Sequence, residues 1–443
     1  MEKYIRYIKR TAAVLVFLAC MLLVNELLRF LLTDDSNSYT RTMLHEMYEQ
    51  ENIDVLFLGS SHSYRSIVPD IMDQEMGMNT FNGGTSSQQP AASYYLLKEA
   101  AKEHKLTRVY LELYYDMLND NKDYQSPTAA YIISDYMKPS WNRLQFLWDT
   151  GGKEYLAHGL ILGRRDWEKI FEPSWVLENV RRKCSEDYQN YAYVTADNEE
   201  YTGRGFVYSN EYIEYGTFTA DERFAPVGEE AISENNRKYL DKIIDFCKEN
   251  DIELIFYSAP VPDFRLAGCG NYDEFIQQVN LLLEGKEVPY YDFNLCKSEF
   301  LKMEDEHFKD DNHLNGEGAE LFSTAFAHFI ASGMDTEEIL WESYAQKMQN
   351  EEERVFGVVC EMQKDETGLI RAQILPVTNR KDPSYYAVYK RTEEEKEYRL
   401  HRAYSEESGF ELPVDEYGYI HIYVAADPEG NNVSNDATFY YGN

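Results

Sequence analysis

The sequence predicts an α/β protein with a doubly wound parallel sheet, an N-terminal transmembrane helix and a small C-terminal β-sandwich. Between residues 52 and 333, short apolar runs typical of buried strands alternate with segments of helical spacing. An apolar segment near the N-terminus is about long enough to span a bilayer. Beyond residue 354, helical periodicity gives way to short runs rich in β-branched and aromatic residues.

Residues 1–33 are interpreted as a membrane anchor. Met1–Arg10 carries four basic residues, and Thr11–Leu32 is predominantly apolar. A cleaved signal peptide is the alternative, but no small-residue cleavage site follows the apolar run. The basic end predicts a single-pass protein of the cell membrane, with everything beyond Asp34 on the extracytoplasmic side.

The first strand is predicted at Val55–Leu58, an uninterrupted apolar run that suits a strand buried on both faces. It ends at Gly59, Ser60 and Ser61. Open α/β sheets place ligands at the carboxyl ends of their strands, and a helix that begins here would offer free N–H groups to a developing oxyanion. Ser61 is therefore a candidate nucleophile, although a plain Gly-Ser-Ser turn explains the same residues.

A candidate base follows about 250 residues later. Asp310 and His313 are three apart in a loop that precedes a segment of helical spacing. At this spacing the carboxylate can reach the far nitrogen of the imidazole, which fixes its tautomer and stabilises the imidazolium that forms when histidine accepts a serine proton. A loop histidine without such a role is the alternative.

The intervening elements complete the expected α/β domain, residues 34–335. We predict a helix at Pro69–Met76, a strand at Met78–Asn82, a helix from Pro90 to about Lys105, strands at Arg108–Tyr114, Ile252–Ser258 and Tyr290–Phe293, and a helix around Leu240–Cys247. A long insertion, residues 117–224, is either a wall or lid over the substrate or a packing subdomain. Arg204 lies between two glycines in it, and it either contacts an anionic or sugar substrate or is a solvated loop residue.

Residues 354–443 are expected to form the β-sandwich, an interaction or carbohydrate-contact module in most proteins that carry one. Its predicted strands are Val355–Val359, Leu369–Val377, Tyr385–Tyr389, Tyr398–Tyr404 and Tyr417–Ala425.

Charge and cysteine content exclude several classes of function. The 43 basic and 78 acidic residues leave a net charge of −35, which argues against nucleic acid as a partner, because phosphate binding needs a basic surface. The six cysteines form no C-x-x-C pair, so neither a zinc site nor a disulfide scaffold is indicated. Cys247 is expected in the core, and a Cys269–Cys296 disulfide is left open. No metal or cofactor is predicted.

Two motifs together resemble the SGNH/GDSL hydrolase superfamily: Gly59-Ser60-Ser61 after the first strand, and D-x-x-H-L-N-x-x-G-A from Asp310 to Ala319. The resemblance covers roughly residues 50–115 and 230–333. It is nearer to the membrane-anchored branch that serves D-alanyl-teichoic acid biosynthesis and polysaccharide O-acetylation. The sequence departs from the pattern at Ser60, where the family usually has an acidic residue. It also lacks the Gly-x-Asn-Asp block after the third strand, whose Asn completes the oxyanion hole.

The resemblance implies an SGNH-like three-layer fold and a serine acyltransferase or acyl esterase. Ser61 takes the nucleophile's place, His313 the base's and Asp310 the orienting acid's, with the N–H groups of Ser61 and Gly84 as oxyanion donors. We expect neighbouring side chains to contact substrate: His62, Arg65 and Gln88. The implied partners are a cell-envelope polysaccharide or teichoic acid and a membrane-bound O-acyltransferase. A non-catalytic scaffold or glycan-binding protein of the same fold is the alternative.

Overall fold

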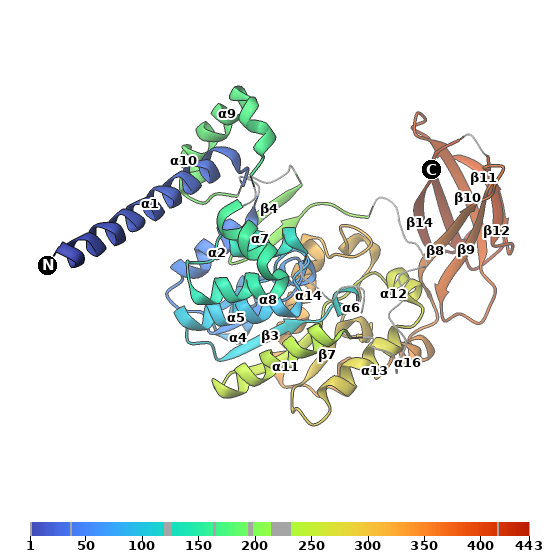
Figure 1. Ribbon diagram of the computed structural model, residues 1–443. Coiled ribbons are helices and arrows are strands. Elements are labelled where there is room, and N and C mark those ends of the chain that lie inside the picture. Colours follow the sequence, from blue (N-terminus) through green and yellow to red (C-terminus); the bar gives the residue numbers. More distant parts are fainter. Residues whose placement is uncertain are drawn as a thin grey trace. The chain divides into compact units, whose positions relative to one another are not determined.

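A five-stranded parallel sheet organises the part of the chain that carries both motifs (Figure 1). The computed structural model describes residues 2–35, 38–118, 126–162, 165–193, 198–213, 232–413 and 416–442. The strands are β1 (Val55–Leu58), β2 (Thr80–Asn82), β3 (Arg108–Glu112), β6 (Glu253–Ser258) and β7 (Tyr290–Asp292), in the order β2-β1-β3-β6-β7. Their carboxyl ends therefore meet at one edge of the sheet.

Helices cover both faces of this sheet. The helices α4 (Pro69–Met76) and α14 (Gly316–Ser332) pack together, as do α5 (Pro90–Glu103) and α11 (Glu234–Glu249). The core on the α14 side is aromatic: the rings of Phe57 and Tyr110 stack at 4.5 Å, and Phe326 of α14 packs edge-on against both. The predicted parallel sheet with alternating helices is thus confirmed.

Local sequence signals explain where these helices begin and end. α4 and α5 each start with a proline at the first helical position, where its missing N–H is not needed. Ser233 caps α11, and Asn315 caps α14 by accepting a hydrogen bond from the N–H of Gly318. The remaining helices of this part are short: α3 (Ser61–Tyr64), α6 (Tyr115–Leu118), α12 (Asp263–Cys269), α13 (Tyr272–Leu283), η4 (Phe293–Leu295), η5 (Asp305–His307), α15 (Thr336–Ile339) and α16 (Tyr344–Asn350).

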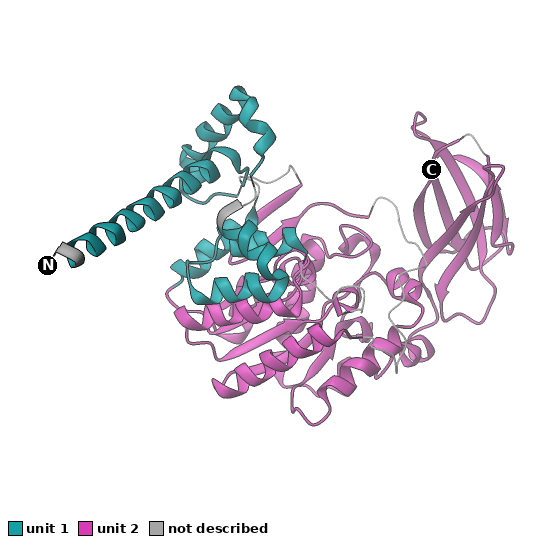
Figure 2. Cartoon of the chain, in the orientation of Figure 1, with its two compact units in different colours: residues 1–50, 124–197 teal, residues 51–123, 198–443 magenta. Residues whose placement is uncertain are grey.

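The chain divides into two units, which Figure 2 colours separately. Unit 1 consists of residues 1–50 and 124–197, and unit 2 of residues 51–123 and 198–443. In its described residues unit 1 is helical: α1 (Glu2–Leu32), α2 (Tyr39–Glu49), α7 (Pro127–Ser134), α8 (Trp141–Ala157), η2 (His158–Leu162), η3 (Trp167–Phe171), α9 (Pro173–Lys183) and α10 (Glu186–Gln189). The ends of the predicted insertion, residues 119–125 and 214–224, lie outside the described residues.

α1 is long and apolar enough to cross a membrane, and its apolar side chains are exposed. A signal sequence has the same length and composition. The N-terminal apolar helix that the sequence predicts is therefore present.

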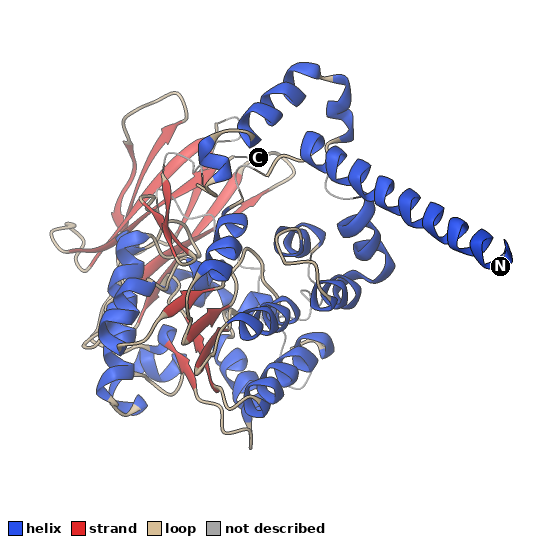
Figure 3. Cartoon of the chain, turned by 90° about the vertical axis from the view of Figure 1, so that its left-hand side faces the viewer, coloured by secondary structure: helices blue, strands red, loops and turns tan. Residues whose placement is uncertain are grey.

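Two antiparallel sheets follow the parallel sheet along the chain, and Figure 3 shows their strands in red. One has the order β11-β10-β13-β14, and the other β12-β9-β8. A single apolar core joins them, with Val358, Ile374, Val388 and Ile420 among its members. The strands are β8 (Val355–Lys364), β9 (Ile370–Thr378), β10 (Tyr385–Thr392), β11 (Arg399–Ser405), β12 (Gly409–Leu412), β13 (Gly418–Ala425) and β14 (Val433–Tyr441). β12 and β14 were not predicted.

A hairpin of β4 (Glu199–Gly203) and β5 (Phe206–Ser209) was also not predicted. Its turn lies against the parallel sheet, because the N–H of Asn82 donates to the carbonyl of Arg204 at 2.9 Å. Gly205 has φ +87°, and a Cβ atom there would overlap the backbone of Asn82. The turn therefore needs its glycine for close approach.

The six cysteines are all free. Cys247 is buried on α11, as its position on the apolar face predicted. Cys269 and Cys296 are buried without forming the disulfide that the sequence left open.

Candidate active site

Ser60 and Ser61 follow β1 directly, and their side chains have different surroundings. The N–H and hydroxyl of Ser60 both donate to the Glu112 carboxyl, at 3.1 and 3.0 Å, and its oxygen accepts from the N–H of His62 at 3.3 Å. Ser60 is thereby buried and caps α3, whereas Ser61, the first residue of α3, is only partly buried. Of the two, only Ser61 presents its hydroxyl to His313.

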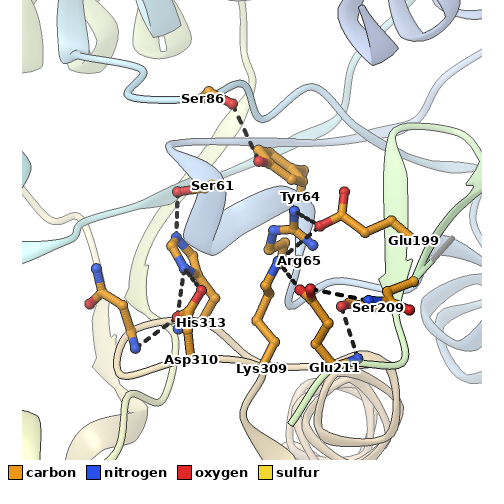
Figure 4. Close-up of polar contacts among 12 residues, drawn as sticks. Ser61, Tyr64, Arg65, Ser86, Glu199, Ser209, Glu211, Lys309, Asp310 and His313 are labelled. Atoms are coloured by element: carbon orange, nitrogen blue, oxygen red, sulfur yellow. Dashed lines mark hydrogen bonds and ion pairs between the residues drawn. The ribbon is translucent and has the colours of Figure 1, made fainter. Parts of the chain in front are cut away.

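Ser61, His313 and Asp310 form a hydrogen-bonded chain (Figure 4). Ser61 Oγ is 2.7 Å from His313 Nε2, although 252 residues separate the two in the sequence. His313 Nδ1 is 3.0 and 3.1 Å from the two carboxylate oxygens of Asp310. The contact between Ser61 and His313 that the sequence predicted is present. When Nδ1–H donates to Asp310, Nε2 is left as the acceptor for the serine proton.

The loop folds back as the three-residue spacing requires. Asp310 also accepts from the backbone N–H groups of Asn312 and His313, at 2.9 and 2.8 Å. Burial acts to raise the pKa of Asp310, but the hydrogen bond and charge of His313 and these N–H groups outweigh it and lower the pKa to about 2. Asp310 is therefore ionised at neutral pH, as a group that stabilises an imidazolium must be.

One backbone donor for an oxyanion is available at the turn. Among the described residues, the N–H of Ser61 has no hydrogen-bond acceptor. The second expected donor, the N–H of Gly84, instead donates to the side chain of Asn82 at 3.1 Å. The Asn82 amide is itself held by the carbonyls of Ser63 and Ile67, so in this state Gly84 donates within the protein.

Glu112 is a site residue that the sequence analysis missed. It ends β3 beside β1, is 5% exposed, and burial raises its pKa to about 8 even though Ser60 donates to it. Ser60 stands where the family pattern has an acidic residue, and Glu112 brings a carboxyl group to that place from the next strand. The available signal was one glutamate in an otherwise apolar strand.

His62 is buried and stacks between two rings at the site. Its ring lies 3.8 Å from that of Tyr114 and 4.7 Å from that of His313. Burial, followed by the charge of His313, holds the pKa of His62 well below its usual value, so the ring is neutral. Tyr114 in turn donates to the side chain of Asn312 in the catalytic loop. His62 thus packs against the imidazole of His313 from the side.

The other two expected substrate contacts, Arg65 and Gln88, are held by protein groups. Arg65 pairs with Glu199 of β4, which also pairs with Lys309, the residue before Asp310 (Figure 4). Gln88 is buried between Thr85 and Ser93. Neither side chain is therefore free to contact a substrate as the sequence analysis expected.

Arg204 is neither a solvated loop residue nor directed at the catalytic serine. It forms ion pairs with Asp70 and Asp73, both in α4. The role of this arginine is to hold the β4–β5 turn on the sheet. Both interpretations in the sequence analysis are therefore replaced by a structural one.

The chain shows only limited similarity to known proteins. No family model and no curated protein matches the chain. Among solved structures, a GDSL-like lipase from Bacteroides thetaiotaomicron is 10% identical with a TM-score of 0.31, covering 68% of this chain and 100% of its own. A protein named as a proposed acylhydrolase from Bacteroides fragilis is 10% identical with a TM-score of 0.30, covering 68% and 99%. At such scores the likeness carries no argument about activity, which has to come from the site.

Proposed function

We propose that this chain is a membrane-anchored serine enzyme of SGNH type that transfers or removes acyl groups on a cell-envelope polymer. The observation that carries the proposal is the hydrogen-bonded chain from Ser61 through His313 to Asp310. A chance meeting of a serine, a histidine and an ionised aspartate in the order needed for nucleophilic catalysis is improbable at the carboxyl edge of a parallel sheet.

The chemistry follows from the atoms in place. Ser61 Oγ attacks the acyl carbonyl carbon while His313 Nε2 takes its proton, and the N–H of Ser61 stabilises the oxyanion. The imidazolium, stabilised by Asp310, then gives the proton to the departing alkoxide as the original ester bond breaks. The acyl group is now an ester of Ser61. In the second half, a polymer hydroxyl or water attacks this ester, His313 again takes the proton, and Ser61 is restored.

With one free backbone donor among the described residues of the turn, we expect slow turnover in both transfer and hydrolysis, because both reactions pass through the same oxyanion. Each backbone donor of this kind is worth about 10²–10³-fold in rate. The N–H of Gly84 donates to Asn82. At this turn, the N–H of Ser61 therefore stabilises the oxyanion without Gly84 unless substrate binding breaks that hydrogen bond. Acetyl and D-alanyl groups fit this chemistry equally, and a membrane-bound O-acyltransferase that delivers the acyl group is the partner we propose.

Labelling with a serine-directed phosphonate tests the proposal. We expect one phosphonyl group per chain on wild type and on Ser60→Ala, and none on Ser61→Ala. Ser60→Ala is the matched control, because it removes the adjacent hydroxyl and costs only the α3 cap and a hydrogen bond to Glu112, roughly 1–2 kcal/mol of stability.

Label on Ser60, or on neither serine, would contradict the assignment. If wild type takes no label but binds glycans, the scaffold alternative is correct. Aryl acetate turnover that accelerates when a glycan acceptor is added identifies a transferase, whereas turnover indifferent to acceptor identifies an esterase.

A further inference from the structure

Unit 1 exposes several large apolar side chains close to the end of α1. Trp167, Ile170 and Phe171 of η3 are 47%, 49% and 87% exposed, and Leu177 of α9 is 51% exposed. α9 follows η3 along the chain and packs against it. Exposed apolar side chains concentrated in two contacting elements are typical of a contact with a membrane or with another protein. We call these four side chains the η3–α9 patch.

The composition of η3 is that of a segment at a membrane surface. Trp167 and Ile170 are three apart, so they share one side of a 3₁₀ turn, and Phe171 ends this turn. Lys169 pairs with Glu172 at 3.0 Å, and both side chains are partly exposed. Aromatic side chains are enriched where a membrane meets water, because their rings enter the lipid while nearby polar groups stay hydrated.

Hydrogen bonds fasten this part of unit 1 to the last turn of α1. The N–H of Asp166, the residue before η3, donates to the carbonyl of Leu32 at 2.7 Å. Asn179 of α9 donates to the carbonyls of Leu31 and Thr33 at 3.0 and 3.1 Å. The patch is therefore held beside the end of the apolar helix, where Figure 1 shows α9 next to α1.

A second contact lies about two turns earlier in α1. Asn25, a polar residue of this apolar helix, donates to the carbonyl of Leu160 at 3.2 Å and accepts from Arg165 at 2.5 Å. Asn25 is about 10 Å from Leu32 along the helix, at ~1.5 Å per residue. Leu160 and Arg165 therefore lie beside the outer end of α1, and their hydrogen bonds satisfy the polar side chain there.

α1 is longer than the hydrocarbon of a bilayer requires. Its stretch Tyr4–Leu32 has 29 residues. At ~1.5 Å per residue it extends about 43 Å, whereas the hydrocarbon core is ~30 Å thick and the bilayer with its head groups ~40–45 Å. If α1 spans the membrane, as the proposed function requires, its last turns and the elements fastened to them lie in the outer head-group region.

The exposed surface of α1 favours lipid over another protein as the partner of the patch. Leu27 and Phe30, in the last turns of α1, are 56% and 37% exposed. Apolar side chains are thus exposed on α1 at the same level as the patch. A membrane that surrounds α1 would cover both surfaces together.

We propose that the η3–α9 patch inserts into the outer interface of the membrane beside α1, and that its partner is the lipid bilayer itself. Unit 1 then contacts the membrane at two places, the crossing helix and the patch, which restricts how it can tilt about the end of α1. The proposal rests on the membrane anchor of the proposed function and not on its catalytic residues.

Spin labels on the full chain in phosphatidylcholine vesicles test the proposal. The background protein has Cys20→Ser and Cys184→Ser, because these two cysteines are exposed. Oxygen concentrates in lipid and a nickel chelate in water. The ratio of collisions with oxygen to collisions with the chelate should be about threefold or more higher for labels at Ile170→Cys and Phe171→Cys than at Leu281→Cys. Leu281 of unit 2 is the matched control, being 52% exposed against 49% for Ile170.

Each other outcome overturns the proposal. Few collisions with either reagent at Ile170 would mean that protein covers the patch, and a ratio equal to that at Leu281 would mean that the patch lies in water. A label at Leu18→Cys, in the middle of α1 and 51% exposed, separates the patch from the anchor. Lipid exposure at Leu18 but not at Ile170 overturns the patch alone, whereas water exposure at both overturns the anchor as well. Phosphonate labelling of the same samples tests the enzyme independently.

A second measurement keeps the patch free of labels. Vesicles with brominated acyl chains should quench part of the tryptophan emission of the wild-type chain, because bromine quenches rings that reach the lipid. Trp167→Tyr should reduce the quenched part. Trp148→Tyr, the control, removes a tryptophan of unit 1 with a similar exposure of 51%, and it should leave the quenched part unchanged. Equal quenching in wild type and Trp167→Tyr would contradict insertion of η3.

Discussion

The two units differ in how they carry charge. Unit 1 has 15 basic and 16 acidic residues and is nearly neutral, so unit 2 carries almost all of the net charge of −35. Around Ser61 in unit 2, Arg65 and Lys309 are each matched by Glu199. In unit 1, burial lowers the pKa of three cations, Arg143, Arg165 and Lys183, and nearby carboxylates act in the opposite direction. The comparison teaches that the acidic character of the chain belongs to one unit and is not spread evenly over both.

The largest expected effect tests whether chemistry belongs to unit 2 alone. His313→Gln should reduce the rate of phosphonylation by about 10⁴-fold or more, because Ser61 loses its only base and members of a triad act as a unit. Stopped-time labelling followed by intact-mass analysis measures it.

His328→Gln is the matched control for this variant. His328 is exposed on α14, the helix that follows the loop with His313, and its replacement should leave labelling at the wild-type rate. Labelling of His313→Gln at the wild-type rate would show that His313 is not the base of Ser61.

An intermediate effect concerns the buried carboxyl of the site. Its pKa is raised from 4.5 to about 8, so the stability that Glu112 contributes is fully present below pH 4.5 and is lost as pH rises through 8. Glu112→Gln stays neutral and should be more stable than wild type at pH 8, by about 1–3 kcal/mol, and similar to it at pH 4.5.

Urea unfolding of both proteins at several pH values checks this. The difference between them isolates Glu112 from the general repulsion within the acidic unit. A difference that does not change between pH 4.5 and 8 would mean that Glu112 is ionised in the fold.

The smallest expected effect concerns the β4–β5 hairpin of unit 2, which Arg204 holds in place through two ion pairs. Arg204→Gln removes the ion pairs to Asp70 and Asp73, which are partly exposed, so we expect a loss of about 0.5–1 kcal/mol. Hydrogen exchange should quicken in β4 and β5 and not in β1. Lys248→Gln, an exposed change on α11, serves as the control, and equal exchange in the two variants would refute the role given to Arg204.

Much of the fold could be predicted because its signals are local. The apolar run Val55–Leu58 and the prolines that open α4 and α5 are read directly from neighbouring residues. β14 was not predicted because its first half, Val433–Asp436, is mostly polar and lacks the pattern of a strand. It forms because it pairs with β13, and the sequence of neither segment indicates that pairing.

The site residues likewise divide into those indicated by nearby sequence and those that depend on distant partners. The spacing of Asp310 and His313 is local, and the family pattern connected them to Ser61. The partners of Glu112 and Arg204 lie 52 and about 130 residues away, so no nearby residue indicates them. The hydrogen bond from the Gly84 N–H to the Asn82 side chain could not be predicted either, since an asparagine side chain near a turn has several possible partners.

The packing of Gly59 against Glu112 has a consequence for how positions 60 and 112 can vary. Gly59 has φ +145°, and a Cβ atom there would lie 2.5 Å from the Cβ of Glu112. The Glu112 side chain fills the space beside the turn and bonds to both donors of Ser60. An aspartate at position 60 would set two carboxyl groups against each other in a buried place. Among homologous chains, an acid at position 60 and an acid at position 112 should therefore exclude one another, and the two positions should change together.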